Sequence, residues 1–600
     1  MKKYLFIISL LSLLTARTFS QSPHIQWTNS LGGGKDEITS SMIGTKDGGY
    51  VIAGYSNSKN GDITDNHGRN DYWIVKLDYE GKMQWQHSYG GSKDDEAMHI
   101  EQTKDEGFIV GGTSESNDGD VTGNHGHKDY WIIRLDKDGT MQWEKSFGGS
   151  GPDNLLTVYP SNNEGYFAVG ETSSNDKQVT GFHGGVDFWA IKLDENGNLI
   201  WEKALGGTED ETLHFSEMTQ DNGIIIGGTS SSFDGDVTEH HFGSTEDYWV
   251  VKLNSKGDLI WEKSLGGSDV DRLYSGHQTF DHGYILAGFT GSDDGDVTGF
   301  HGFDDYWIVK LDSNGMIEWE NALGGSYTDF AYSIEQASDG DYYISGTTTS
   351  NDGDVMGYHG QEYDFINDYW IVKLDPMGNL IWQKCLGGYN SDNSQGIQLT
   401  HDGGCIAFGY SSSFPQNHGG QDYFIDKLSA SGNSRYKISL GGSNNEYPTS
   451  LIPTADGGFT VAGYSYSDDG NVKDHHGATT SSDFWVVNVA GKRAKEESNI
   501  SNEDVYVSEK SLFSTNSIFI FPTVTTGCLE VNFSVSHMYS PFATIEIINS
   551  NGAIIKSEKM AIAGPNFKIP LYLDATLSKG IYFVKVRMEN EVLTKKIFLQ

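Results

Sequence analysis

The chain has 600 residues, of which 36% are hydrophobic and 75 are glycines, and its formal net charge is −42 at pH 7. A negative charge of this size repels nucleic acids and anionic lipids, so the sequence excludes a nucleic-acid-binding function. Only three cysteines occur, Cys385, Cys405 and Cys528, and we expect free thiols rather than a fold held together by disulfide bonds.

Residues 1–20 have the pattern of a secretory signal peptide. Two lysines precede an apolar run over residues 4–14, and the small residues Thr18 and Ser20 lie just before the expected cleavage site. The apolar run is too short to span a bilayer, and no later segment qualifies as a transmembrane segment. We therefore expect an exported, soluble mature protein.

One sequence unit recurs eight times between residues 21 and 489. Each unit carries a Gly-Gly mark, and the second glycines of these marks are Gly33, Gly91, Gly149, Gly207, Gly267, Gly325, Gly388 and Gly442. Successive marks are 54 to 63 residues apart, most often 58. In the second unit the pattern predicts four short strands, near 97–103, 108–114, 130–136 and 140–147. Four-stranded units that repeat in this way are typical of the blades of a β-propeller, since one blade alone cannot bury both of its faces.

The two ends of the repeat region predict how the ring closes. The eighth unit ends after its third strand, at 484–489, and a strand of the missing fourth type lies at the other end of the region, at 24–27. If this N-terminal strand completes the last blade, the ring has no mismatched end. We therefore predict an all-β fold, an eight-bladed propeller over residues 21–489.

The 14 tryptophans fall at two positions of the repeat. Such regular spacing favours packing between blades over an aromatic array for binding sugars. On the third strand they are Trp73, Trp131, Trp189, Trp249, Trp307, Trp370 and Trp485, and on the fourth they are Trp27, Trp85, Trp143, Trp201, Trp261, Trp319 and Trp382.

A carboxylate follows each Gly-Gly mark by four residues, where the chain enters the innermost strand. These residues are Glu37, Asp95, Asp153, Glu211, Asp271, Asp329, Asp392 and Glu446. One interpretation is an acidic ring around the axial opening that binds or conducts cations. The eightfold repetition favours a structural role instead, in which each carboxylate accepts hydrogen bonds from the loop amides of its own blade.

The long loop between the second and third strands carries the candidate metal ligands. Carboxylates two residues apart on a glycine bend suit calcium, although a polar turn needs the same residues without metal. The candidates are Asp62, Asp118, Asp120, Asp234, Asp236, Asp294, Asp296, Asp352 and Asp354. Unit three departs from the pattern with Asp176-Lys177-Gln178 and unit seven with a shorter loop. These loops suggest calcium as a cofactor, and the sequence establishes no cofactor.

A histidine follows in every unit: His67, His125, His183, His241, His301, His359, His418 and His476. Zinc needs ligands that converge from several elements, and one histidine per blade around a broad wheel does not converge. We therefore interpret these histidines as structural, hydrogen-bonded at the start of the third strand.

Departures from the repeat on the same loop face mark the candidate ligand contacts. Aromatic residues replace the usual asparagine before the histidine in three units, and unit six carries an insertion. The residues concerned are Phe182, Phe300, Tyr358, Glu362, Tyr363, Asp364 and Phe365. An aromatic and acidic patch on a loop face suits contact with a polysaccharide or a protein.

After a charged linker at 490–516, residues 517–600 are predicted to form several short alternating strands, as in a small β-sandwich. Four motifs stand out: Phe521-Pro522, Asn551-Gly552, Lys579-Gly580-Ile581-Tyr582-Phe583-Val584 and Thr594-Lys595-Lys596-Ile597-Phe598-Leu599. With these motifs the segment resembles the type A C-terminal sorting domain of the type IX secretion system, although Thr523-Val524 stands where a Pro-Asn-Pro opening is usual. The resemblance implies the type IX machinery as a partner. It also implies a product that is secreted, extracellular or anchored at the outer surface of a Gram-negative cell.

The sequence contains no assembled catalytic motif, so the leading interpretation is a non-catalytic propeller for binding or adhesion, with a polysaccharide or protein ligand. One alternative is a secreted polysaccharide hydrolase or lyase that uses carboxylates in the axial cleft. Another is a calcium-dependent structural component of the cell surface.

Overall fold

The computed structural model describes residues 23–161, 165–241, 246–360, 366–414 and 417–491, and strands between residues 517 and 599. The chain divides into two units, 1–494 and 495–600. The predicted signal peptide, the linker residues 492–516 and the unit-six insertion at 361–365 lie outside the described residues.

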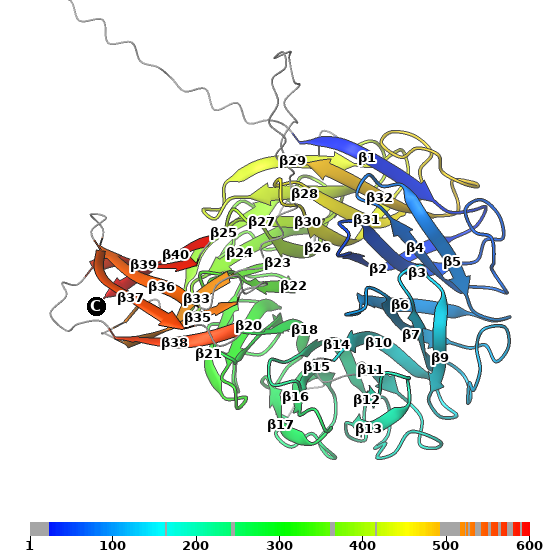
Figure 1. Ribbon diagram of the computed structural model, residues 1–600, viewed down its shortest axis with the longest axis horizontal. Helices are drawn as coiled ribbons and strands as arrows, with labels where there is room; N and C mark the ends of the chain where they lie inside the picture. The colour runs from blue at the N-terminus through cyan, green and yellow to red at the C-terminus, as the bar shows by residue number, and fades with distance from the viewer. Residues whose placement is uncertain are drawn as a thin grey trace, which may run out of the picture. The chain divides into compact units, whose positions relative to one another are not determined.

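The first unit is a wheel of eight four-stranded antiparallel sheets, which confirms the predicted eight-bladed propeller (Figure 1). We call the four strands of a blade A to D. Strand A lines the centre of the wheel and strand D the rim, as the labels in Figure 1 show. The A strands are β2 (Glu37–Gly44), β6 (Asp95–Gln102), β10 (Asp153–Pro160), β14 (Glu211–Met218), β18 (Asp271–Gln278), β22 (Asp329–Gln336), β26 (Asp392–Leu399) and β30 (Glu446–Pro453).

The B strands are β3 (Tyr50–Ser56), β7 (Phe108–Ser114), β11 (Tyr166–Thr172), β15 (Ile224–Ser230), β19 (Tyr284–Thr290), β23 (Tyr342–Thr348), β27 (Cys405–Ser411) and β31 (Phe459–Ser465). The C strands are β4 (Asp71–Leu77), β8 (Asp129–Leu135), β12 (Asp187–Leu193), β16 (Asp247–Leu253), β20 (Asp305–Leu311), β24 (Asp368–Leu374), β28 (Asp422–Leu428) and β32 (Asp483–Ala490). The D strands are β5 (Met83–Tyr89), β9 (Met141–Phe147), β13 (Leu199–Leu205), β17 (Leu259–Leu265), β21 (Ile317–Leu323), β25 (Leu380–Leu386), β29 (Ser434–Leu440) and β1 (His24–Leu31).

The ring closes as the sequence predicts. The last sheet has the order β1-β32-β31-β30, so the N-terminal strand is the D strand of the eighth blade. Its register runs from His24 opposite Ala490 to Leu31 opposite Phe484. The Trp485 indole also donates a hydrogen bond of 2.8 Å to the hydroxyl of Thr28. The two ends of the wheel are therefore joined by a full strand ladder and not by a covalent link.

The two tryptophan positions pack between neighbouring blades in different ways. The C-strand tryptophans are fully buried, and Trp131 lies 4.6 Å, between ring centroids, from Tyr72 of the preceding blade. The D-strand tryptophans are only partly buried, and each donates its indole N–H to a carbonyl in the C–D turn of the next blade, as Trp143 does to Glu195 at 3.1 Å. The C-strand rings therefore belong to the core, whereas the D-strand rings keep a face toward solvent.

The second unit forms two sheets. One has the order β33-β35-β38 and the other β34-β40-β39-β36-β37. The strands are β33 (Ser517–Phe521), β34 (Val524–Thr525), β35 (Cys528–Ser534), β36 (Phe542–Asn549), β37 (Ile554–Ala561), β38 (Asn566–Tyr572), β39 (Gly580–Met588) and β40 (Glu591–Leu599). In the part of the chain that the structure describes, no helix has the length and hydropathy to cross a membrane.

Candidate functional site

The Gly-Gly mark is the point where two blades and a long loop meet. A Cβ on Gly90, the first glycine of its mark, would lie 2.8 Å from Oδ2 of Asp95 and 2.8 Å from Cγ of Asp71. A Cβ on Gly91 would lie 2.5 Å from the carbonyl oxygen of Asp118 in the B–C loop. Both glycines are therefore needed because any side chain here would displace a carboxylate or the loop backbone.

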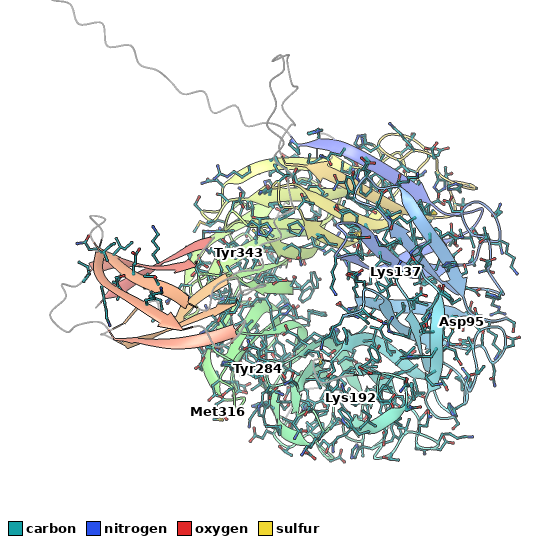
Figure 2. The ribbon with its side chains drawn as sticks, viewed as in Figure 1. Asp95, Lys137, Lys192, Tyr284, Met316 and Tyr343 are labelled. Atoms are coloured by element: carbon teal, nitrogen blue, oxygen red, sulfur yellow. The ribbon has the colours of Figure 1, made fainter. Side chains whose placement is uncertain are left out.

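The carboxylates that follow the marks turn into the protein. All eight predicted ring residues are fully buried, Asp95 (labelled in Figure 2) among them. Asp95 accepts hydrogen bonds from the Gly91 N–H at 2.7 Å, from the Ser116 hydroxyl at 2.8 Å and from the Ser114 hydroxyl. Burial is also the main reason why the pKa of Glu211 rises to about 7. In this geometry the carboxylates hold the loop of their own blade and do not present oxygens to an axial passage.

The Asp-Gly-Asp loops form a clasp on the neighbouring connection. Oδ1 of Asp118 accepts a hydrogen bond of 2.7 Å from the Ser92 N–H, and Oδ2 of Asp120 accepts one of 3.2 Å from the Gly90 N–H. The Asp120 N–H donates to the Gly90 carbonyl at 2.9 Å. The loop of one blade therefore fixes the chain as it arrives from the previous blade. The equivalent aspartates of the other loops accept backbone N–H groups in the same way. They are Asp62, Asp234, Asp236, Asp294, Asp296, Asp352 and Asp354.

Two of the units without the second aspartate keep this clasp with a neutral side chain. In the third blade Gln178 accepts the Gly148 N–H at 3.1 Å, and in the eighth blade Asn471 accepts the Gly441 N–H at 3.2 Å. The clasp therefore needs a hydrogen-bond acceptor at this position and not a charge. Among the described residues, no three or more His, Cys, Asp or Glu side chains are grouped as a metal site. Calcium binding by these loops stays a prediction.

Calorimetric unfolding of the full chain with calcium and with a chelator tests that prediction. Calcium held by the loops would raise the melting temperature, because a ligand that binds only the folded state stabilises it. The matched variant is Asp120→Asn, which copies the natural Asn471. For the clasp alone we expect Asp120→Asn to change stability by less than about 0.5 kcal/mol. A calcium-dependent stabilisation that Asp120→Asn reduces would instead make Asp120 a metal ligand.

Each repeated histidine lies against the aspartate that starts strand C. The His125 Nδ1 lies 2.8 Å from Oδ2 of Asp129, and its backbone N–H donates to the same oxygen at 2.8 Å. The other seven histidines make the same pair of contacts. In the fourth and eighth blades the preceding residue is also a histidine, His240 or His475, and its side chain is almost wholly buried beside the same aspartate.

The described aromatic residues of the predicted ligand patch are less exposed to solvent than the sequence suggests. Phe182 and Phe300 are half-buried and pack against apolar clusters between blades. The Tyr358 hydroxyl donates to the Ile366 carbonyl at 2.7 Å. Glu362, Tyr363, Asp364 and Phe365 lie outside the described residues. The described aromatic members of this patch are therefore engaged in the fold.

The opposite face, which carries the tight A–B and C–D turns, has grooves at the seams between blades. The groove between the first and second blades has a volume of about 600 Å³, and the one between the second and third about 450 Å³. A third, between the seventh and eighth blades, has about 390 Å³. Each includes the D-strand aromatic residue of its first blade: Trp85, Trp143 and Tyr436, respectively. Sequence reasoning assigned these rings to packing between blades, so it missed the grooves.

Charged and amide side chains surround the aromatic ring in each groove. In the first groove they are Lys46, Asp47, Lys76, Asp78, Lys82, Gln84, Gln102, Glu106, Lys137 and Asp138. Several are already paired, as Lys76 is with Asp47 at 2.9 Å. The four lysines balance the four carboxylates, whereas the whole chain has 41 basic and 83 acidic residues. The groove is therefore less repulsive to an anionic ligand than the strongly negative chain as a whole.

Comparison with protein families identifies the tail. Residues 519–600 match the secretion system C-terminal sorting domain. This match confirms the type IX sorting domain that the motifs indicate, and the protein is accordingly secreted or attached at the outer surface. No curated protein matches the sequence.

Several solved structures resemble the chain weakly. A surface component of the type IX secretion system of Porphyromonas gingivalis, PorZ, is 10% identical with a TM-score of 0.31, over 95% of this chain and 74% of PorZ. A puromycin hydrolase is 11% identical with a TM-score of 0.36, over 62% of this chain and 50% of the hydrolase. A mutant of the Synechocystis apocarotenoid oxygenase is 10% identical with a TM-score of 0.32, over 68% of this chain and 95% of the oxygenase. Likenesses this weak carry no inference about function.

Proposed function

We propose that the protein is a non-catalytic binding propeller, exported through its sorting domain, and that its ligand is a polysaccharide held in the seam grooves. The observation that supports this most is the pairing of a partly exposed indole with a set of polar side chains in one groove, as around Trp85. An aromatic face suits the apolar face of a sugar ring, and the surrounding amides and charges suit its hydroxyl groups.

The repetition of the grooves also supports a polymer as ligand. Neighbouring seams carry the same type of groove, with Trp85 in one and Trp143 in the next. A chain of sugars that contacts two grooves at once gains in apparent affinity, because the second contact is intramolecular. A protein ligand remains the alternative outcome of the test below.

The test compares two faces of the wheel with glycan-array binding followed by titration of the best short oligosaccharide. We expect Trp143→Ala to weaken binding about tenfold, equivalent to about 1.4 kcal/mol, because it removes the ring of one groove. Trp143→Tyr, which copies the natural Tyr436, should keep most of the affinity.

The control for the opposite face is Phe300→Ala, which alters the patch that the sequence first suggested. It should leave binding unchanged if the grooves hold the ligand. Weaker binding in Phe300→Ala and normal binding in Trp143→Ala would move the site to the long-loop face. No binding to any glycan, with capture of a protein instead, would refute the polysaccharide assignment.

A further inference from the structure

Each seam between neighbouring blades buries two carboxyl groups that face one another. In the seam between the second and third blades these are Asp129, at the start of β8, and Asp153, at the start of β10, and both are fully buried. A Cβ on Gly148 would lie 3.0 Å from Oδ1 of Asp129 and 2.5 Å from Oδ2 of Asp153. The two oxygens therefore border the same small space beside that glycine.

The two groups differ in their hydrogen-bond partners. Asp153 accepts from the Gly149 N–H at 2.7 Å, from the Ser174 hydroxyl at 2.9 Å and from the Thr172 hydroxyl. Oδ2 of Asp129 accepts from the backbone and ring of His125. Oδ1 of Asp129 is buried and has no partner. Of the four oxygens in the seam, one lacks a donor.

The same oxygen lacks a partner in every seam, and in the two seams that end at Asp271 and Asp329 Oδ1 of the A-strand aspartate lacks one as well. Oδ1 is buried and unpartnered in Asp71, Asp129, Asp187, Asp247, Asp305, Asp368, Asp422 and Asp483. These are the residues that start the eight C strands, and each faces the carboxylate that starts the next A strand. Because the unpartnered oxygen occurs in all eight seams, it is a regular feature of the interface between blades.

A bare buried oxygen next to a second carboxylate is unfavourable for two reasons. The oxygen has lost its water and gained no donor, and two anions in a dry seam repel each other. One proton on Oδ1 of Asp129 removes both problems. Oδ2 then acts as the carbonyl oxygen that accepts from His125, and the new O–H points its proton toward Asp153, whose three donors stabilise the remaining negative charge.

We propose that each seam is a proton-binding site, in which the C-strand aspartate carries a proton on Oδ1 and donates it to the A-strand carboxylate of the next blade. The wheel then holds about eight protons in its seams at a pH where exposed carboxyl groups have lost theirs. Each seam carries one negative charge in place of two.

The repeats themselves supply a comparison that supports a removable proton. At the clasp the chain uses Gln178 or Asn471 in place of aspartate. At the two seam positions it uses only Asp or Glu, although an asparagine at position 129 would supply a permanent donor to Asp153. The chain therefore has an aspartate, which donates only when it is protonated, at a position where an asparagine would always donate.

Other titratable groups lie around this seam. His125 approaches Asp129 from the B–C loop of the second blade. The loop of the third blade contributes the neutral Gln178 to Gly148 and the carboxylate of Asp176, which accepts from the Ser150 N–H at 2.7 Å. The buried Tyr130 hydroxyl donates to the Trp189 carbonyl, and burial together with the charge of Asp153 raises its pKa. Burial raises the pKa of Asp129, an effect that the contacts with His125 oppose. Burial likewise raises the pKa of Asp153 to about 6, and the charge of Asp129 adds to the rise.

The direction of the pH effect follows from these raised values. Between about pH 4 and pH 6 the folded seam keeps a proton that the unfolded chain has released. The stability that the seam protons contribute is therefore fully present below the pKa of the carboxyl groups in the unfolded chain. It is lost as the pH rises through their higher pKa in the folded chain. The wheel should be more stable at pH 5 than at pH 8.

The experiment compares the full chain with Asp129→Asn in 0.5 M salt, which screens the surface charge but not the buried pair. Tryptophan fluorescence reports on the propeller alone, because all 14 tryptophans lie between residues 27 and 485. We expect the melting temperature of the wild type to fall from pH 5 to pH 8. Asp129→Asn should fold, lose about one proton of the eight bound by the native state, and weaken the infrared band of protonated carboxylic acids by about one-eighth.

The matched variant is Asp153→Asn, which sets an amide N–H against the Gly149 N–H and should be clearly less stable than Asp129→Asn. Equal proton binding and an unchanged infrared band in Asp129→Asn would overturn the proposal. So would a wild-type melting temperature that does not fall between pH 5 and pH 8 in 0.5 M salt, because the folded seams would then hold no proton to release.

Discussion

A chain that lacks the closing strand β1, residues 24–31, is expected to lose most of its folding stability. Deletion exposes the edge of β32 and removes the burial of Ile25, Trp27 and Leu31. At roughly 1.5–3 kcal/mol for each buried apolar side chain, the cost is on the order of 5 kcal/mol or more. This is comparable to the whole stability of many domains. Urea unfolding followed by tryptophan fluorescence measures the loss.

Moving the same strand to the other end of the propeller is the control. His24 pairs with Ala490, so a loop of a few residues after Ala490 can lead into a copy of residues 24–31. We expect this permuted chain, starting at Gly32, to regain most of the lost stability, because the ladder with β32 is restored. If the deleted chain unfolded at the same urea concentration as the full chain, strand exchange would not be what closes the ring.

Replacement of Trp131 by alanine is expected to cost about 3–5 kcal/mol, the range for removing a large aromatic side chain from a core. Trp131 is fully buried, packs against Tyr72 and donates its indole N–H to Glu144 at 3.0 Å. The loss includes the cavity and the hydrogen bond to Glu144, which keeps its contacts with Thr122. Chemical denaturation of the full chain gives the free energy of unfolding.

The repeat offers a matched control for this variant. In the seventh blade the C-strand position is Phe424, which is also buried. Trp131→Phe should therefore lose clearly less than Trp131→Ala, since it keeps an aromatic ring against Tyr72. Trp143→Ala on the rim should also cost less stability than Trp131→Ala, because its ring is only partly buried. Equal losses for Trp131→Ala and Trp143→Ala would contradict the division between core and rim tryptophans.

Strand positions in a repeat are easy to read, and the prediction was close. The four strands expected in the second unit match β6 to β9 within two residues at each end. Alternation, Asp-Gly turns and the Gly-Gly marks are local signals, and eight copies average out the exceptions in any one unit. The closure of the wheel could also be predicted from the number of strands. The eighth unit has a C strand but no D strand, so the N-terminal strand has to supply it.

The chemistry of the seams was much harder to predict. The sequence shows a carboxylate after each mark and another at the start of each C strand, but not that Asp129 and Asp153 border the same space beside Gly148. Likewise, an Asp-Gly-Asp loop looks the same whether it binds calcium or clasps the Gly90 backbone. The regular spacing of the D-strand aromatics favoured packing, and only the tertiary structure shows that these rings are partly exposed.

The sequence by itself determined the all-β class, the number of blades, the closing strand and the export address, because periodicity, turn residues and the tail motifs are properties of nearby residues. Only the tertiary structure decided which carboxyl oxygens are left without donors and where the surface is hollowed. Both depend on distances between residues of different blades, such as Trp143 and Glu195, which lie 52 positions apart in the chain. Local pattern carries no information about those distances; the packing of one blade against the next sets them.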